Sequence, residues 1–117
     1  MANILLVEDN TEMRLLLQEI LEWGGHHVRC GRSGEDGLRT LTEAATPDLI
    51  ISDLMMPGMD GFTFLQRVRQ DARWAQVRFV MMSANPQDDR LQNPRQDGFD
   101  GVLPKPFSLE DLDALLA

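Results

Sequence analysis

Short apolar runs alternate with helix-like segments along the whole chain. The runs fall at residues 3–7, 49–52, 79–82 and 102–103, with a shorter one centred on Val28, and none exceeds five residues. Between them, apolar residues recur every three or four positions, which is the spacing of one helix face. Continuous apolar strands are typical of a parallel sheet that is covered on both faces. The alternation therefore predicts an α/β fold with a single doubly wound sheet of five parallel strands.

One connection departs from this alternation. Residues 85–97 should hold the helix between the fourth and fifth strands, but Leu91 is their only large apolar residue and Pro94 interrupts them. Burying one leucine contributes roughly 1.5–3 kcal/mol, which does not offset the ~1–2 kcal/mol that ordering each backbone residue costs. We therefore predict a weak fourth helix: a short or irregular, mobile segment with at most one or two turns between residues 87 and 93.

Composition narrows the class of protein. The 117 residues have a length typical of one domain, which we place at residues 1–117. Nineteen acidic and eleven basic residues give a net charge of −8, so we expect no direct nucleic-acid binding, which needs a basic face.

No apolar run approaches the about 20 residues of a membrane helix, and no secretory signal opens the chain. The lone Cys30 excludes an intrachain disulfide. We therefore expect a cytoplasmic protein without membrane contact.

Charged and polar residues stand at the carboxyl ends of four predicted strands. They are Glu8 and Asp9, Asp53, Ser83, and Lys105, in chain order. In open α/β sheets these ends meet at one edge, where ligands bind. Lys105 is the only lysine and lies between two prolines, a pattern that helix capping does not explain. Carboxylate oxygens without imidazole or thiolate suit Mg²⁺, and cations beside a carboxylate favour phosphoryl transfer.

Four segments resemble response-regulator receiver domains of two-component signalling. They are residues 4–10 (ILLVEDN), 47–61 (PDLIISDLMMPGMDG), 82–84 (MSA) and 103–107 (LPKPF), and the likeness covers essentially the whole chain. The resemblance implies a flavodoxin-like sheet with strand order 2-1-3-4-5. It also implies a cis peptide bond between Lys105 and Pro106.

The resemblance implies a role for each residue at the predicted edge. Asp53 would accept a phosphoryl group from a sensor histidine kinase or a histidine phosphotransfer protein. Lys105 would pair with the phosphoryl group, and Ser83 would be the hydroxyl switch residue. The implied Mg²⁺ ligands are the carboxylates of Glu8, Asp9 and Asp53 and the backbone carbonyl of Met55. Such a protein is a signalling phosphoprotein that catalyses only its own phosphorylation and slow dephosphorylation.

Two alternatives stay open at this point. Val102 stands where the family commonly has an aromatic switch residue. Together with the weak fourth helix, it is compatible with a pseudo-receiver that binds partners without phosphorylation. An Asp-nucleophile phosphatase of the haloacid dehalogenase type needs a second Asp two residues after Asp53, where this chain has Met55. The sequence identifies no downstream partner or fused effector domain.

Overall fold

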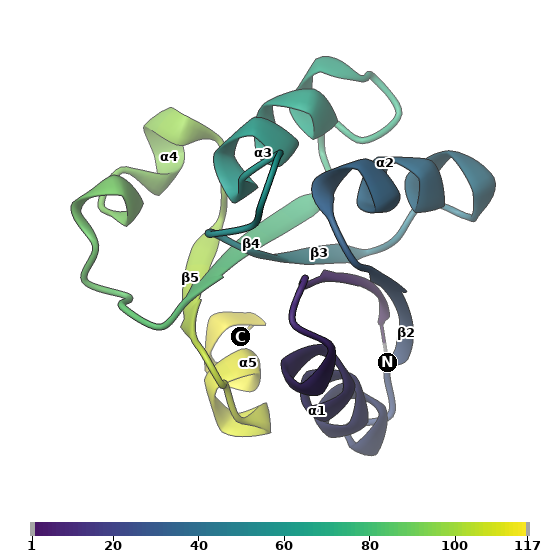
Figure 1. Cartoon of the computed structure of the whole chain (residues 1–117), viewed down its shortest axis with the longest axis vertical. Helices are drawn as coiled ribbons and strands as arrows, with labels where there is room; N and C mark the ends of the chain where they lie inside the picture. The colour runs from purple at the N-terminus through teal and green to yellow at the C-terminus, as the bar shows by residue number, and fades with distance from the viewer. Residues whose placement is uncertain (1, 117) are drawn as a thin grey trace.

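Five short strands form one parallel sheet in the predicted order (Figure 1). The structure is a computed structural model that describes residues 2–116. Its strands are β1 (Asn3–Val7), β2 (His27–Gly31), β3 (Leu49–Asp53), β4 (Arg78–Ser83) and β5 (Gly101–Pro104). They lie in the order β2-β1-β3-β4-β5. The predicted fold class is therefore confirmed.

Helices cover both faces of the sheet. They are α1 (Thr11–Trp23), α2 (Gly34–Glu43), α3 (Gly61–Gln70), α4 (Pro94–Asp97) and α5 (Leu109–Leu116). α1 and α5 lie on one face, and α2 and α3 lie on the other (Figure 1). Side chains alternate along a strand, so Ile4 and Leu6 pack with α1 and α5, whereas Leu5 and Val7 pack with α2 and α3. This burial on both faces explains the continuous apolar runs. Among residues 2–116, no helix has both the length and the apolar character to cross a membrane.

The central strand β3 fixes the position of Asp53. All five residues of β3 are buried, and the strand pairs with β1 on one side and β4 on the other. Its one internal polar side chain, Ser52, donates a hydrogen bond to the backbone oxygen of Asp53 at 3.0 Å. Asp53 therefore ends a strand that is hydrogen-bonded to a neighbour on each side and buried on both faces.

The helical structure between β4 and β5 is short and irregular, as predicted, but its α-helical turn does not lie where the sequence predicts it. A 3₁₀ turn covers Asp89–Leu91, and α4 is a single turn that begins at a proline. The predicted location between residues 87 and 93 is therefore wrong for α4. Proline lacks an N–H, but the first N–H groups of a helix have no partner within the helix, so proline starts one readily. Gly98, in the left-handed region with φ 92°, ends the turn.

Two apolar residues anchor this connection to the core. Leu91 and Phe99 are both buried in the cluster under α2 and α3. The Phe99 ring packs edge-on against Phe62 of α3, with ring centroids 6.1 Å apart. Val102 lies part-buried against the same cluster. An aromatic ring therefore fills this corner of the molecule from position 99 instead of position 102.

Amide hydrogen exchange should separate this connection from the sheet. Residues 88–97 have only single-turn backbone hydrogen bonds, whereas β4 is paired on both sides. We therefore expect amides of residues 88–97 to exchange at least about a hundred-fold faster than those of β4 in the free protein. Protection across residues 88–97 equal to that of β4, measured by NMR or mass spectrometry, would instead show a stable helix and contradict the prediction.

The two tryptophans lie in opposite environments. Trp74 is 4% exposed and belongs to the core cluster under α2 and α3. Trp23 ends α1 and is 86% exposed. Leu15 and Leu16, in the middle of the same helix, are also exposed. α1 therefore buries one face against the sheet and presents large apolar side chains to solvent on another.

Candidate functional site

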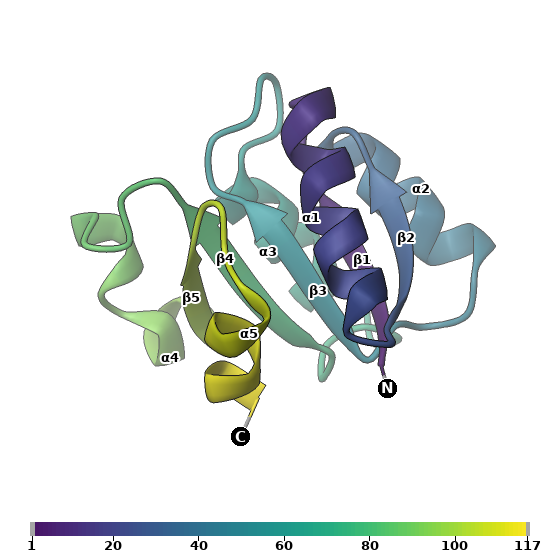
Figure 2. The ribbon, with the colours of Figure 1, turned by 90° about the horizontal axis from the view of Figure 1, so that it is seen from below.

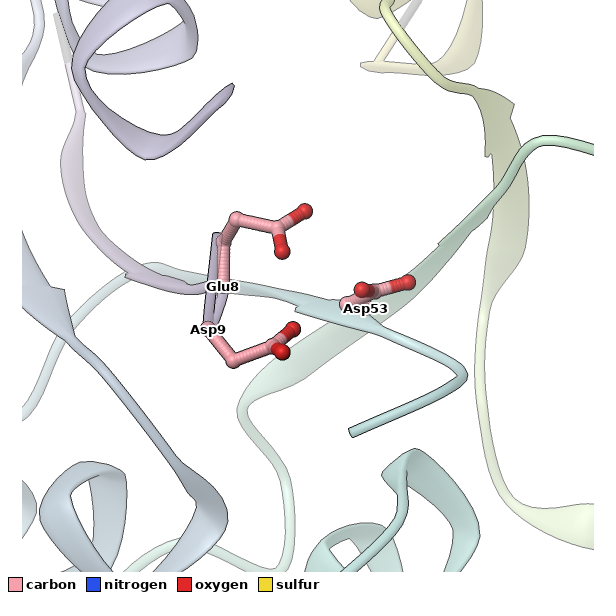
Figure 3. A group of neighbouring side chains, drawn as sticks. All are labelled: Glu8, Asp9 and Asp53. Carbon is pink, nitrogen blue, oxygen red and sulfur yellow. The ribbon is translucent and has the colours of Figure 1, made fainter. Parts of the chain in front are cut away.

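Three carboxylates meet at the carboxyl edge of the sheet. Val7 of β1 pairs with Ser52 of β3, so the residues that follow them, Glu8 and Asp53, come side by side. Asp9 follows at once, and one carboxylate oxygen from each of the three acids lies within 4.8 Å of the others. Figure 3 shows the Glu8 and Asp9 carboxylates turned toward Asp53. The structure thus brings together three of the predicted site residues.

The single lysine lies between two of these acids. Lys105 Nζ is 2.8 Å from Asp53 Oδ2 and 3.0 Å from Glu8 Oε1. Burial by itself lowers the pKa of Lys105, but the hydrogen bonds to Asp53 and Glu8 outweigh it and raise the pKa above its usual value. The side chain therefore stays an ammonium and compensates part of the negative charge of the cluster. The Lys105–Pro106 bond is cis, as the resemblance implied.

Glu8 is the most enclosed member of the cluster. It has no exposed surface, and burial is the main reason why its pKa is raised. The Asn10 N–H, which donates to Glu8 Oε2 at 3.0 Å, and Lys105 oppose that rise. Both carboxylate oxygens of Glu8 are thus engaged within the protein, whereas Asp9 is exposed to solvent. Asp9 therefore offers the most accessible carboxylate oxygens of the cluster, because Asp53 is also buried.

Ser83 and Met55 lie next to this cluster in different ways. Asp53 pairs with Met82, so Ser83 lies one residue further along the neighbouring strand. Its hydroxyl donates to the Asn85 oxygen at 3.1 Å and accepts from the Asn85 N–H at 3.0 Å. The Met55 N–H donates a long hydrogen bond of 3.4 Å to Asp53 Oδ1, and the Met55 side chain is 62% exposed.

Other residues that support the site were not predicted from the sequence. Arg14 donates to the backbone oxygen of Glu8 at 2.9 Å, and Arg90 of the 3₁₀ turn contacts Met55 Sδ at 3.6 Å. Asn10 also caps α1 by accepting the Met13 N–H at 2.9 Å, a role that an Asn before a helix could have suggested. No local pattern distinguishes the two arginines from other surface arginines.

The fold and this site are shared with known proteins. The family described as "Response regulator receiver domain" matches residues 4–117. The chain belongs to this family. It is 38% identical to the transcriptional regulatory protein AfsQ1 of Streptomyces coelicolor over 97% of its own length and 49% of that protein. The chain thus spans about half the length of this relative.

Solved structures extend the comparison. The chemotaxis protein CheY4 of Vibrio cholerae is 31% identical, with a TM-score of 0.88 over 99% of this receiver and 96% of that chain. The receiver domain of the sensor histidine kinase PA1611 from Pseudomonas aeruginosa is 27% identical, with a TM-score of 0.86 over 98% of this receiver and 93% of that chain. Its structure is described as having a magnesium ion coordinated in the active-site cleft.

Membership in the family fixes the class of function. Receiver domains are signalling modules of two-component systems, not classical enzymes, and they interact with histidine kinases or phosphotransfer proteins. They bind Mg²⁺ at an acidic pocket. The donor set of this receiver fits that ion, because its three clustered side chains are all carboxylates and Mg²⁺ prefers hard oxygen ligands at few protein positions.

Proposed function

We propose that Asp53 accepts a phosphoryl group, in a Mg²⁺-dependent reaction, from a sensor histidine kinase or a histidine phosphotransfer protein. The position of the Asp53 carboxylate carries this proposal. It is buried at the end of β3, 2.8 Å from Lys105 Nζ and within 4.8 Å of oxygens of Glu8 and Asp9. A nucleophile among fixed cation-binding groups is the arrangement that phosphoryl transfer needs.

The proposed transfer is a displacement at phosphorus. An Asp53 oxygen forms the new P–O bond while the P–N bond of the phosphohistidine breaks and its electron pair returns to the imidazole, which takes up a proton. Bound Mg²⁺ would neutralise phosphoryl oxygens, and its proposed ligands are Glu8, Asp9, Asp53 and the backbone carbonyl of Met55. The acyl phosphate carries about −1.5 to −2 units of charge in place of the single charge of the carboxylate, and Lys105 Nζ already lies beside Asp53 Oδ2.

We assign the switch to the Ser83 hydroxyl. In this structure it is bonded to the backbone of Asn85 in both directions. A phosphoryl oxygen is a stronger acceptor than a neutral carbonyl, so phosphorylation favours rotation of the hydroxyl away from the Asn85 oxygen. The start of the connection to α4 then loses a hydrogen bond. Because the new contact exists in only one state, it shifts the population toward that state.

Chemical phosphorylation tests the proposed function against both alternatives. With acetyl phosphate and Mg²⁺, we expect the protein to gain the mass of one phosphoryl group, and with a chelator in place of Mg²⁺ we expect no gain. A pseudo-receiver would gain nothing in either buffer. An Asp-nucleophile phosphatase would hydrolyse a generic phosphate ester through many turnovers, whereas a receiver would not.

The exposed side of α1 is the proposed contact for the phosphodonor protein. α1 begins just after Asp9, and Leu15 is 57% exposed on it. We expect Leu15→Glu to slow transfer from the donor protein at least about ten-fold, because it removes apolar contact area, and to leave labelling by acetyl phosphate unchanged. Trp23→Gln, at the far end of α1, is the matched control. Equal slowing of both reactions would show damage to the site and refute this contact.

The phosphorylated form should be long-lived. Met55 lies two residues after Asp53, beside the expected path of the hydrolytic water, and its thioether accepts hydrogen bonds only weakly. Asn85 lies two residues after Ser83, and its side-chain oxygen already accepts the Gln87 N–H at 3.2 Å. The Met55 side chain therefore cannot orient water by a strong hydrogen bond, and we expect a half-life of minutes or longer in Mg²⁺ buffer.

Substitution at position 55 checks this explanation. We expect Met55→Asn to shorten the half-life several-fold, because an amide can orient water, and Met55→Leu to leave it unchanged. The measurement is the decay of intact phosphoprotein by mass spectrometry. Decay of the parent protein within seconds would contradict the prediction.

A further inference from the structure

A cavity lies at the amino-terminal ends of β1 and β2, whereas the acidic cluster lies at the carboxyl ends of the strands. Its volume is about 480 Å³, and it is lined by the first residues of β1 and β2 and by the end of α2 with the loop that follows. Figure 2 shows α2 beside the edge strand β2. Pockets for small organic ligands typically measure about 300–1,000 Å³, so this cavity has the size of a small-molecule site. It shares no residue with the proposed phosphorylation site.

The inner wall of the cavity is apolar. Leu5 of β1 and Leu41 of α2 line it and belong to the buried cluster on this face of the sheet. Ala44, Ala45 and Pro47, after the end of α2, also line it. Because two of these residues are alanines, the loop leaves open the space that larger side chains would fill. This wall suits the hydrocarbon part of a ligand.

The rim of the cavity carries hydrogen-bond donors. Asn3 pairs with His27, and Leu5 pairs with Arg29, so strand alternation directs His27 and Arg29 to the face on which Leu5 packs. Both line the cavity and both are exposed. Among residues 2–116, Arg29 makes no salt bridge. An unpaired guanidinium is thus available at the rim, in a chain whose net charge is −8.

The remaining charged groups leave the rim favourable for an anion. His26 Nδ1 accepts the Ala2 N–H at 3.1 Å, which assigns the proton of the neutral ring to Nε2 and makes that atom a donor. Glu22 is the one acid among the lining residues. The nearby Asp48 carboxylate already accepts the Asn3 N–H at 2.8 Å. Glu22 is therefore the one carboxylate of the lining, beside one guanidinium and two imidazoles, and the charge of Asp48 lies outside the lining, bonded to the backbone of Asn3.

We propose that this cavity binds a small organic carboxylate with an apolar body. The carboxylate would pair with Arg29, which can donate two parallel hydrogen bonds, and the apolar body would lie against Leu5, Leu41 and the alanines. The site would make the receiver responsive to a small molecule. That molecule would bind at the amino-terminal ends of the strands, away from the proposed phosphorylation site.

A matched pair of probes tests this site by amide NMR. Titration with 3-phenylpropionate should give saturable shifts confined to amides of the lining residues, among them Asn3, Arg29 and Ala45. The neutral analogue 3-phenylpropionamide should bind at least about ten-fold more weakly, because it lacks the charge-assisted hydrogen bonds. Arg29→Gln should weaken binding of the acid by a similar factor and leave binding of the amide unchanged.

Two further variants make the test specific. Arg67→Gln removes another exposed arginine that lies outside the cavity, and it should leave binding unchanged. Ala45→Leu should abolish binding of both probes by filling the cavity, and a dispersed amide spectrum verifies that the variant is folded. Absence of saturable shifts at the lining residues, equal affinity for acid and amide, or unchanged binding in Arg29→Gln would each overturn the proposal.

Discussion

Asp53→Asn should end phosphoryl uptake from both acetyl phosphate and the donor protein. The amide has no anionic oxygen to attack phosphorus, so no acyl phosphate forms and labelling should fall to background. The side chain keeps its size, but one end now presents an N–H₂ group. That group meets either the Lys105 ammonium or the Met55 N–H, which are both donors. We expect a change in the free energy of unfolding of only about 1–2 kcal/mol, because Glu8 still pairs with Lys105.

A matched control separates a specific loss from a general effect of charge. Asp89→Asn removes an exposed carboxylate from the 3₁₀ turn and should label like the parent protein. Mass spectrometry of the intact chain, followed by mapping of the modified peptide, gives the result. Undiminished labelling of Asp53→Asn would move the phosphoacceptor to another carboxylate and refute the assignment.

Lys105→Ala should separate two properties that the parent protein combines. Without the ammonium, Glu8 and Asp53 lie buried beside each other with no cation between them. Loss of one partner from a buried ion pair costs about 3–5 kcal/mol of folding stability. Mg²⁺ binds the folded state and should restore part of that loss. We therefore expect a lowered melting temperature that rises on addition of Mg²⁺ more than in the parent protein.

The same variant should lose the response to phosphorylation more than it loses metal binding. The carboxylates that we assign to Mg²⁺ all stay in Lys105→Ala, whereas the cation that would hold the phosphoryl group is gone. The measurement compares amide NMR shifts on Mg²⁺ addition with those on addition of a phosphate-mimicking fluoride complex. Lys105→Arg keeps the charge and should recover part of the response. A Lys105→Ala protein that responds like the parent would exclude this role for the lysine.

The sheet and its acidic edge could be predicted from the sequence because local patterns encode them. The residues of β1, β3 and β4 are apolar without alternation, which indicates strands covered on both faces. Glu8 and Asp9 come just after β1, and Asp53 is the last residue of β3. When two parallel strands are neighbours in the sheet, their carboxyl ends bring these acids together. β1 and β3 are such neighbours, and Val7 pairs with Ser52.

Contacts between distant surface residues could not be predicted in the same way. The Arg14 bond to Glu8 and the contact of Arg90 with Met55 depend on side-chain directions across loops, and sequence periodicity contains no information about these. The error at α4 had a different cause. Pro94 interrupts a helical pattern in the sequence, but the missing N–H costs nothing when proline is the first residue of a helix.

The opposite environments of the two tryptophans give this protein two separate optical reporters. The chain has no tyrosine, so its near-ultraviolet emission comes almost entirely from Trp23 and Trp74. Trp74, enclosed in the core, should emit at shorter wavelength and shift to the red only when the fold opens. Trp23 already emits from water, and its emission should change when a protein covers the end of α1. A Trp23→Phe variant would therefore report unfolding alone, and a Trp74→Phe variant would report contacts at the far end of α1, outside the proposed phosphodonor contact at Leu15.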